Sequence, residues 1–256
     1  MFMQLGGYEV DILVGGYPGK SLRHGGLGWS TVALLRGHGR VAVLDTGSFG
    51  LRRYLLQALR DRGVEPGDVT DLVLSHLHYD HVVNWPMFSA ARITVGEAEL
   101  RWALDRPIGD PLVPEFYVRP LADHPRLTTV GEAQEVLPGI TAHLAPGHTP
   151  GHLMFLLAGA ERDLLLVQDA AKYRAELVSG RADMTYDPAV TAATIRRIWE
   201  FWRRKPGTVV LPGHDLPMVL EADRPVRMGR QEAGIIALFG EDVADRTLFG
   251  LGPAGA

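Results

Sequence analysis

The sequence predicts a mixed α/β fold (α/β or α+β) built as a single domain over residues 1–256. Short apolar runs with strand-like alternation are interspersed with segments whose apolar residues recur at helical spacing. No Pro-, Gly- or Ser-rich linker divides the chain, and its 256 residues suit one α/β or sandwich domain. The hydrophobic content of 46% is enough for a substantial core.

The first third of the chain is expected to form strands at 8–14, 30–35, 40–45 and 71–74, with one helix among them. Apolar residues at i, i+3, i+4, i+7 and i+8 mark the helix face. These are Leu51, Tyr54, Leu55, Ala58 and Leu59, between a capping Ser48 and a terminating Gly63. The glycine-rich segment 17–28 is expected to be a loop, acting either as a flap over a site or as a plain connector.

Later strands are expected at 92–95, 140–144, 153–157, 163–167 and 208–211, the last being the final strand. Helices are expected at 96–105 and at 188–204, where Asp187-Pro188 is a typical cap-then-proline start. Residues 106–126 contain five prolines and are expected to be an irregular excursion, a surface insertion rather than a pocket wall. The tail after Phe249 is expected to be frayed.

One short segment carries most of the chemical information. It reads Ser75-His76-Leu77-His78-Tyr79-Asp80-His81 and directly follows the apolar strand 71–74. A chance His-x-His-x-Asp-His in a chain of this composition has odds of roughly one in a thousand. Neutral imidazole and carboxylate suit borderline metals such as zinc, so the segment is interpreted as part of a metal site.

Composition narrows the classes of protein and partner. The chain has no cysteine, so disulfides and thiolate ligands are excluded and any metal must be held by nitrogen and oxygen. The net charge of −4 gives no general attraction to nucleic acid. No window approaches the ~18 apolar residues of a membrane span, and residues 1–7 lack a signal-peptide pattern. A cytoplasmic protein without nucleic-acid or membrane partners is therefore expected.

Three further candidate ligands stand at the ends of later strands. His148 lies in Gly147-His148-Thr149-Pro150-Gly151-His152, Asp169 follows strand 163–167, and His214 follows strand 208–211. Strand ends provide a rigid base from which side chains can converge. The remaining histidines have no convergent partners in sequence and are interpreted as turn, surface or structural residues. They are His24, His38, His124 and His143.

Taken in order, these blocks resemble the metallo-β-lactamase-fold hydrolases over about residues 30–215. Asp45-Thr46-Gly47 also resembles that family's early Asp-x-Gly turn. The resemblance implies a four-layer αββα metallo-β-lactamase-like sandwich with two divalent metal ions at the strand ends. Zinc is the expected metal, with iron or manganese as alternatives.

The resemblance also implies a ligand set and a reaction. His76, His78 and His148 would hold the first ion, Asp80, His81 and His214 the second, and Asp169 would bridge them. A metal-bound hydroxide would attack a carbonyl carbon, so no serine or cysteine nucleophile is needed. His152 and Asp45 are expected beside the ligands rather than among them, with Asp45 orienting a ligand imidazole.

Two residues are assigned catalytic roles. Asp80 is expected to orient the hydroxide, or to act as general base if the second metal site is empty. Lactonases of the resembled family place a tyrosine three residues after the bridging aspartate, whereas this chain has Lys172 there and Tyr173 next. Tyr173 is favoured to stabilise the carbonyl oxygen, with Lys172 as the alternative. A third option is that both residues lie in a solvated loop without a catalytic role.

The expected substrate is a small molecule, a lactone or a related carboxylic ester. The chain lacks the large insertion of the family's nucleases, the long helical C-terminal region of glyoxalase II and an export signal, and His78 stands where the diiron oxidoreductases place glutamate. A thioesterase, a β-lactam hydrolase, an iron-dependent persulfide dioxygenase-like oxidase and a metal-binding protein without catalysis stay open as alternatives. The oligomeric state is left open, with a homodimer as one option.

Overall fold

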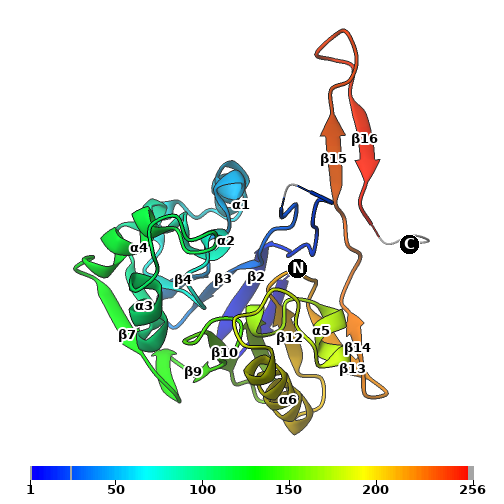
Figure 1. Ribbon diagram of the computed structural model, residues 1–256. Coiled ribbons are helices and arrows are strands. Elements are labelled where there is room, and N and C mark those ends of the chain that lie inside the picture. The colour runs from blue at the N-terminus through cyan, green and yellow to red at the C-terminus, as the bar shows by residue number, and fades with distance from the viewer. Residues whose placement is uncertain (1, 24, 253–256) are drawn as a thin grey trace.

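The computed structural model describes residues 2–23 and 25–252, so His24 and residues 253–256 of the tail lie outside it (Figure 1). Its centre is two seven-stranded sheets. The first sheet has the order β1-β2-β3-β4-β5-β6-β7, antiparallel from β1 to β4 and parallel from β4 to β7. Its strands are β1 (Phe2–Leu5), β2 (Tyr8–Val14), β3 (Val32–Gly37), β4 (Arg40–Leu44), β5 (Asp71–Val73), β6 (Arg92–Gly96) and β7 (Leu127–Val130).

The second sheet has the order β14-β13-β12-β11-β10-β9-β8. Its neighbouring strands are antiparallel, except for the parallel pair of β11 and β12. Its strands are β8 (Gln134–Leu137), β9 (Ile140–Leu144), β10 (Leu153–Leu157), β11 (Leu164–Gln168), β12 (Val209–Pro212), β13 (Met218–Glu221) and β14 (Arg224–Arg227).

Helices cover the outer faces of the two sheets (Figure 1). The α-helices are α1 (Arg52–Arg60), α2 (Tyr79–Val82), α3 (Glu97–Leu104), α4 (Glu115–Ala122), α5 (Arg174–Ser179) and α6 (Pro188–Arg204), and the 3₁₀ helices are η1 (Phe49–Leu51), η2 (Pro66–Asp68), η3 (Trp85–Phe88) and η4 (Asp169–Ala171). One core lies between the sheets, a second joins the first sheet to α1, α3 and α4, and a third joins the second sheet to α5 and α6. This arrangement confirms the predicted αββα layers.

Strand alternation explains how each sheet contributes to two cores. In β4, Ala42 and Leu44 point into the core between the sheets, whereas Val43 points to the core beneath the helices. Helix α6 begins as predicted, because the Asp187 carboxylate accepts hydrogen bonds from the Ala189 and Val190 backbone N–H groups.

Some predictions about secondary structure were wrong, and some observed elements were not predicted. Residues 106–126 are not irregular throughout, since they contain α4 with Pro120 inside it. Burial of Val118 and Leu121 in the core outweighs the hydrogen bond that the proline removes from this two-turn helix. Strands β1, β7 and β8 were not predicted, and β12 is not the final strand. The buried face of α1 is narrower than predicted, because Tyr54 is exposed.

The histidine segment is also less irregular than predicted. Its second half, from Tyr79, forms the short helix α2, which places Asp80 and His81 on a helical turn rather than in an extended loop. No helix among residues 2–23 and 25–252 has the length and apolar character needed to cross a membrane.

A carboxylate at the edge of the second sheet gives a pH-dependent stability prediction. Glu132 contacts Arg197 of α6 and His143 of β9. Partial burial acts to raise the pKa of Glu132, but hydrogen bonds from Arg197 and His143 lower it to about 2, from an ordinary 4.5. A depressed folded-state pKa means that the contact stabilises fully above pH 4.5 and fades as the pH falls toward 2.

We therefore expect Glu132→Gln to lower the melting temperature clearly at neutral pH and by much less near pH 3, measured by circular dichroism. Glu161→Gln, which changes an exposed turn carboxylate, is the control and should show little difference at either pH. An equal loss for Glu132→Gln at both pH values would contradict the assignment.

The last two strands stand apart from both sheets. Strands β15 (Gly234–Ala237) and β16 (Thr247–Gly250) pair only with each other and project from the body as a hairpin (Figure 1). The described part of the tail after Phe249 therefore belongs to this hairpin rather than being frayed.

Candidate metal centre

The predicted ligands meet at one edge of the two sheets. His76 and His78 follow β5, Asp169 follows β11, and His214 follows β12. His148 lies in the turn between β9 and β10. The strands preceding these ligands are short and buried, so each side chain starts from a rigid position.

Three overlapping groups of side chains have ligand atoms within 4.8 Å of one another. They are His76, His78 and His148; Asp80, His81 and His214; and His76, His81 and Asp169. The first two groups are the two sets that the family resemblance implied. The structure thus brings together all seven of the predicted metal ligands.

Asp169 lies between the two groups. Its Oδ2 is 3.3 Å from His148 Nε2, and its Oδ1 is 3.3 Å from His81 Nε2 and 3.4 Å from His214 Nε2. One carboxylate oxygen therefore faces each group, which is the arrangement a bridging ligand requires.

Several of the nitrogen and oxygen atoms that face the centre lack hydrogen-bond partners among the described residues and could instead bind metal ions. Three of them are buried and make no hydrogen bond of normal geometry in the described part of the chain: His76 Nε2, His81 Nε2 and Asp169 Oδ1. Buried polar atoms are almost always paired, so a cluster of unpaired ones indicates missing partners. Imidazole nitrogens and carboxylate oxygens are ligands for zinc and similar ions, so the residues present fit two divalent metals.

The three imidazoles of the first group, those of His76, His78 and His148, have lowered pKa values. Burial lowers the pKa of the His76 and His148 imidazoles well below the usual 6.5, and it lowers the pKa of His78 to about 4. Neighbouring imidazoles lower the pKa of His76 further. These rings are therefore neutral at physiological pH, and a neutral ring has a lone pair to offer.

Carboxylates and imidazoles shift one another's pKa values in the second group. Burial acts to lower the pKa of His81 and His214, but the carboxylates of Asp169 and Asp80 raise both, that of His214 to about 9. Burial likewise acts to raise the pKa of Asp169, yet the imidazoles of His214 and His81 hold it well below 3.8. A divalent cation would take the place of these protons and satisfy the same carboxylates.

Asp45 orients one candidate ligand, the His81 imidazole. Its Oδ2 is 2.8 Å from His81 Nδ1 and accepts a hydrogen bond from Ser75 Oγ at 2.7 Å, while its Oδ1 accepts one from the Ser75 backbone N–H at 2.8 Å. This fixes the ring so that Nε2 faces the site. Asp45 has φ of +54°, a strained backbone that the surrounding hydrogen bonds maintain.

Sequence reasoning missed Ser75 and Glu99. Ser75 Oγ lies 3.0 Å from His76 Nδ1, and its position directly before the motif is the only sequence signal for it. Glu99 is fully buried on α3, where its carboxylate accepts hydrogen bonds from Leu77 N (3.0 Å), Thr149 Oγ1 (2.6 Å) and Gly151 N (3.2 Å). Glu99 therefore joins the two histidine segments, although in sequence it resembles an ordinary surface position of a helix.

Removing this carboxylate should destabilise the fold and loosen the site. Glu99→Ala leaves three buried donors unpaired, so we expect the free energy of unfolding to fall by roughly 3–5 kcal/mol. Glu99→Gln keeps one acceptor oxygen and should cost less than half of that. Chemical denaturation of both variants tests this, and Glu97→Ala, on the exposed face of the same helix, is the control. Equal stability of Glu99→Ala and wild type would contradict the assignment.

His152 lies beside the ligands but not among them. Its ring centroid is 4.8 Å from that of His76, the ring is fully buried, and neither nitrogen has a hydrogen-bond partner among the described residues. It belongs to none of the three ligand groups. Burial lowers the pKa of His152 to about 3, so the ring is neutral.

Lys172 and Tyr173 have different surroundings. Lys172 is buried, with Nζ 2.9 Å from Glu176 Oε1. Burial, and then the carboxylates of Glu176 and Asp183, raise the pKa of the Tyr173 phenol above its usual 10. Tyr173 therefore keeps its proton. Each of the two side chains has a carboxylate neighbour, Asp183 for the Tyr173 phenol and Glu176 for the Lys172 ammonium.

Comparison with known proteins gives the family. A model of the metallo-beta-lactamase superfamily matches residues 25–214, which include all seven candidate ligands. The N-acyl homoserine lactonase AiiA of Bacillus thuringiensis subsp. kurstaki is 27% identical over 164 residues, 63% of this chain and 62% of that protein. Metallo-beta-lactamase domain-containing protein 1 of Xenopus laevis is 29% identical over 187 residues, 73% of this chain and 71% of that protein.

Solved structures share the fold. AidC, a dizinc quorum-quenching lactonase determined in complex with a product, has a TM-score of 0.74 at 18% identity, over 90% of this chain and 98% of that one. An N-acyl homoserine lactone hydrolase with N-hexanoyl-L-homoserine at its catalytic metal centre has a TM-score of 0.66 at 21% identity, over 83% and 94%. The family model covers well over half of the sequence, and the chain belongs to the metallo-beta-lactamase superfamily.

Proposed function

We propose that the protein is a metal-dependent hydrolase of lactones or related carboxylic esters and that it holds two zinc ions. The observation that carries this proposal is the position of Asp169, with one oxygen toward each of two histidine-containing groups. Similar proteins include N-acyl homoserine lactonases, although the alignment spans only 62% of their length. Two bound cations would lower the pKa of a shared water toward 7 and polarise the substrate carbonyl.

In this proposal Asp80 orients the attacking water. Its side chain is 16% exposed, against 4% for Asp169, and its Oδ2 is 3.3 Å from His214 Nε2. The Ser30 hydroxyl donates a hydrogen bond to the backbone carbonyl of Asp80, which helps to hold this turn. Asp80 therefore presents a carboxylate oxygen that can accept a hydrogen bond from water and orient it toward a carbonyl carbon.

Tyr173 supplies a proton donor in this proposal. A phenol that stays protonated can donate a hydrogen bond to the carbonyl oxygen as negative charge develops on it. We expect Tyr173→Phe to lower kcat roughly 10- to 100-fold with little change in KM, because the contact strengthens only in the transition state. Tyr54→Phe, at an exposed tyrosine of α1 away from the metal centre, is the control. Full kcat in Tyr173→Phe together with loss in Lys172→Met would transfer the role to lysine.

Aromatic side chains beside the metal centre suit a substrate with an apolar part. Trp102 of α3 has its ring centroid 6.0 Å from that of His78 and 5.9 Å from that of Tyr186. Tyr79 and Tyr186 are partly exposed. These rings can contact an acyl chain while its carbonyl lies at the metal centre.

A substrate panel tests the proposal. Zinc-loaded protein would be assayed with N-hexanoyl-L-homoserine lactone, a glutathione thioester and a cephalosporin, and metal content would be measured in parallel. We expect ring opening of the lactone and two zinc ions per chain. Activity on the thioester alone would make the protein a thioesterase, and one iron per chain with no hydrolysis would overturn the hydrolase assignment.

A further inference from the structure

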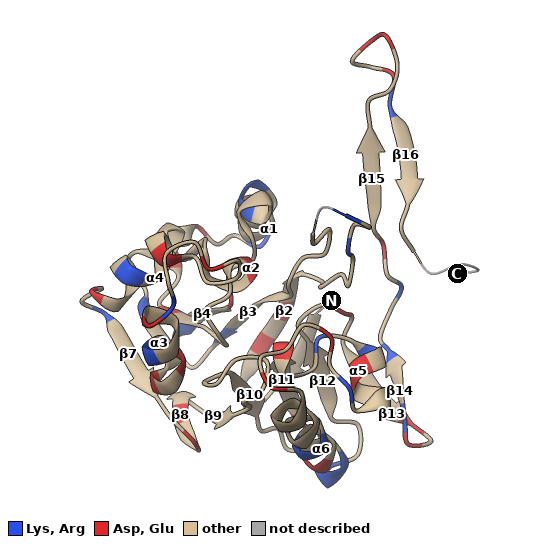
Figure 2. Cartoon of the chain, viewed as in Figure 1, with Lys and Arg blue, Asp and Glu red and all other residues tan. Residues whose placement is uncertain are grey.

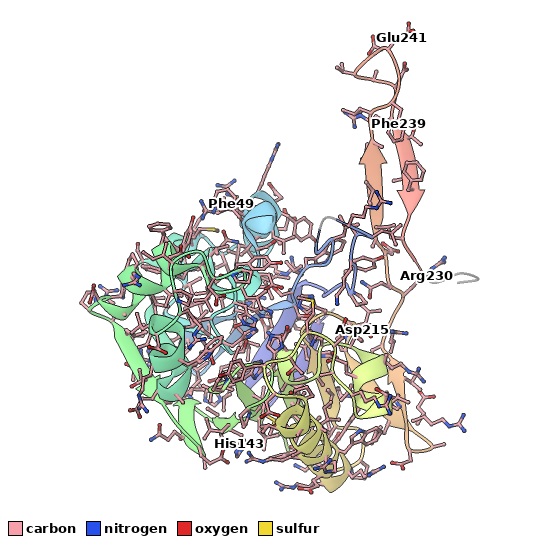
Figure 3. The ribbon with its side chains drawn as sticks, viewed as in Figure 1. Phe49, His143, Asp215, Arg230, Phe239 and Glu241 are labelled. Atoms are coloured by element: carbon pink, nitrogen blue, oxygen red, sulfur yellow. The ribbon has the colours of Figure 1, made fainter. Side chains whose placement is uncertain are left out.

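The hairpin of β15 and β16 has features of an interaction surface. We name residues 231–252 the arm. Figures 1 and 3 show it projecting beyond the sheets and helices, with Phe239 and Glu241 far from the body. None of the three core clusters contains a described arm residue. A two-stranded hairpin on its own is at best marginally stable in water, so an unsupported arm suggests a missing neighbour.

Both faces of the arm are apolar. Ile236 pairs with Leu248 on one face, and their side chains are 58% and 73% exposed. Ile235 pairs with Phe249 on the opposite face, where the Phe239 ring lies 6.3 Å from that of Phe249. A hairpin that packs against its own body needs one apolar face, whereas this arm exposes two. Contiguous exposed apolar surface of this kind marks sites of protein association.

The base of the arm is anchored, so its direction is defined. The Tyr17 hydroxyl donates a hydrogen bond to the Leu251 carbonyl (2.8 Å), and Gln231 Nε2 donates one to the Gly16 carbonyl (2.9 Å). These bonds join both ends of the arm to the 15–29 loop. The arm is therefore a fixed projection of the fold rather than a free tail.

The tip of the arm and helix α1 have opposite charge. The tip carries Glu241, Asp242 and Asp245 against the single basic residue Arg246, and α1 carries Arg52, Arg53 and Arg60 with no acidic residue (Figure 2). Of these arginines, Arg60 lies 3.6 Å from Glu65. Beside these arginines, Phe49 and Tyr54 are exposed. Figure 1 places α1 on the side of the body from which the arm projects. An apolar arm with an acidic tip thus complements the basic and aromatic surface of α1.

We propose that the arm docks onto a second copy of this chain, with each acidic tip against α1 of the other protomer. One chain carries both complementary surfaces on the same side, so a two-fold axis can satisfy both contacts at once. Exchange of arms would also cover both apolar faces, one against the partner's arm and the other against its body. The arm contributes about 20 residues, near the number that a stable interface uses on each side.

Sedimentation equilibrium of the full-length chain tests the association. We expect wild-type protein at twice the 28.0 kDa chain mass. Leu248→Asp and Phe239→Asp should each weaken the dimer at least about tenfold with an unchanged circular dichroism spectrum, because they bury a charge in the interface. Ile108→Asp alters a residue that is equally exposed (72%) but distant in sequence from arm and α1, and should remain dimeric.

Cysteine cross-linking tests where the tip lies, and the natural chain contributes no cysteine background. A chain carrying both Arg53→Cys and Glu241→Cys should form a covalent dimer with a short bis-maleimide, whereas each single variant should not. A wild-type monomer at all concentrations, including one that binds lipid vesicles instead, overturns the proposal. A dimer that survives Leu248→Asp, or one that shows no cross-link, also overturns it.

Discussion

Asp169→Asn is expected to remove metal from both halves of the candidate centre and to lower lactone hydrolysis on the order of a thousandfold. Among the described residues, Asp169 is the carboxylate whose two oxygens face different groups of candidate ligands. An amide replaces one of these oxygens with a nitrogen that donates hydrogen bonds and removes the negative charge, so it cannot bridge two cations. Metal content by mass spectrometry and kcat/KM measure the effect.

Asp105→Asn is the matched control for this prediction. Asp105 is a surface carboxylate, 82% exposed and paired only with its neighbour Arg106 among the described ion pairs. It should keep wild-type metal content and kcat/KM. Two tightly held ions in Asp169→Asn would contradict the bridging role and would reduce Asp169 to an orienting residue.

Gly213→Ala is expected to displace the Asp169 carboxylate, because the added methyl group would lie against it. A Cβ at position 213 would lie 1.9 Å from Asp169 Oδ1, far inside contact distance, so the carboxylate or the backbone must move. Gly213 N also donates a hydrogen bond to the Gln168 carbonyl, and its own carbonyl accepts one from Thr31, so the backbone is held on both sides. We expect a loss of roughly 1–3 kcal/mol in the free energy of unfolding and about a hundredfold loss of kcat/KM.

The control for that substitution is Gly67→Ala. Gly67 lies in η2, and a Cβ there would have nothing within 4 Å. Stability and kcat/KM should be unchanged within about 0.5 kcal/mol. If Gly213→Ala behaves like Gly67→Ala in denaturation and metal titration, the close packing of residue 213 against Asp169 is not functionally important.

The sequence predicted those elements that are marked by neighbouring residues, such as a helix cap or apolar alternation along a strand. The start of α6 at Asp187-Pro188 and the strands β9 and β10 were predicted at the residues where the structure has them. These segments have their own caps or their own apolar alternation. Helix α4 was not predicted, because the burial of Val118 and Leu121 against distant strands stabilises it despite Pro120. Strands β7 and β8 have four residues each, two of them polar, and they form because neighbouring strands offer backbone partners.

The candidate ligands could be proposed from the sequence because metal chemistry restricts the residue types and because they follow predicted strands. The residues that hold these segments in place by hydrogen bonds could not be predicted from the sequence. Glu99 is separated from Leu77 by 22 positions and from Thr149 by 50, and nothing in its local sequence distinguishes it from an exposed glutamate. Burial alone reveals its role, and burial is a property of the packed layers.

The sequence by itself determined the family resemblance, because the motifs place particular residue types in a fixed order and spacing. The αββα class and the seven candidate metal ligands were implied by that resemblance. Only the tertiary structure decided that Asp169 faces both ligand groups, that Glu99 joins the two histidine segments and that residues 231–252 form a projecting arm. The physical reason is that each of these features is a distance between segments far apart in the chain. Such distances follow from the summed packing of two sheets and their helices, which no local pattern encodes.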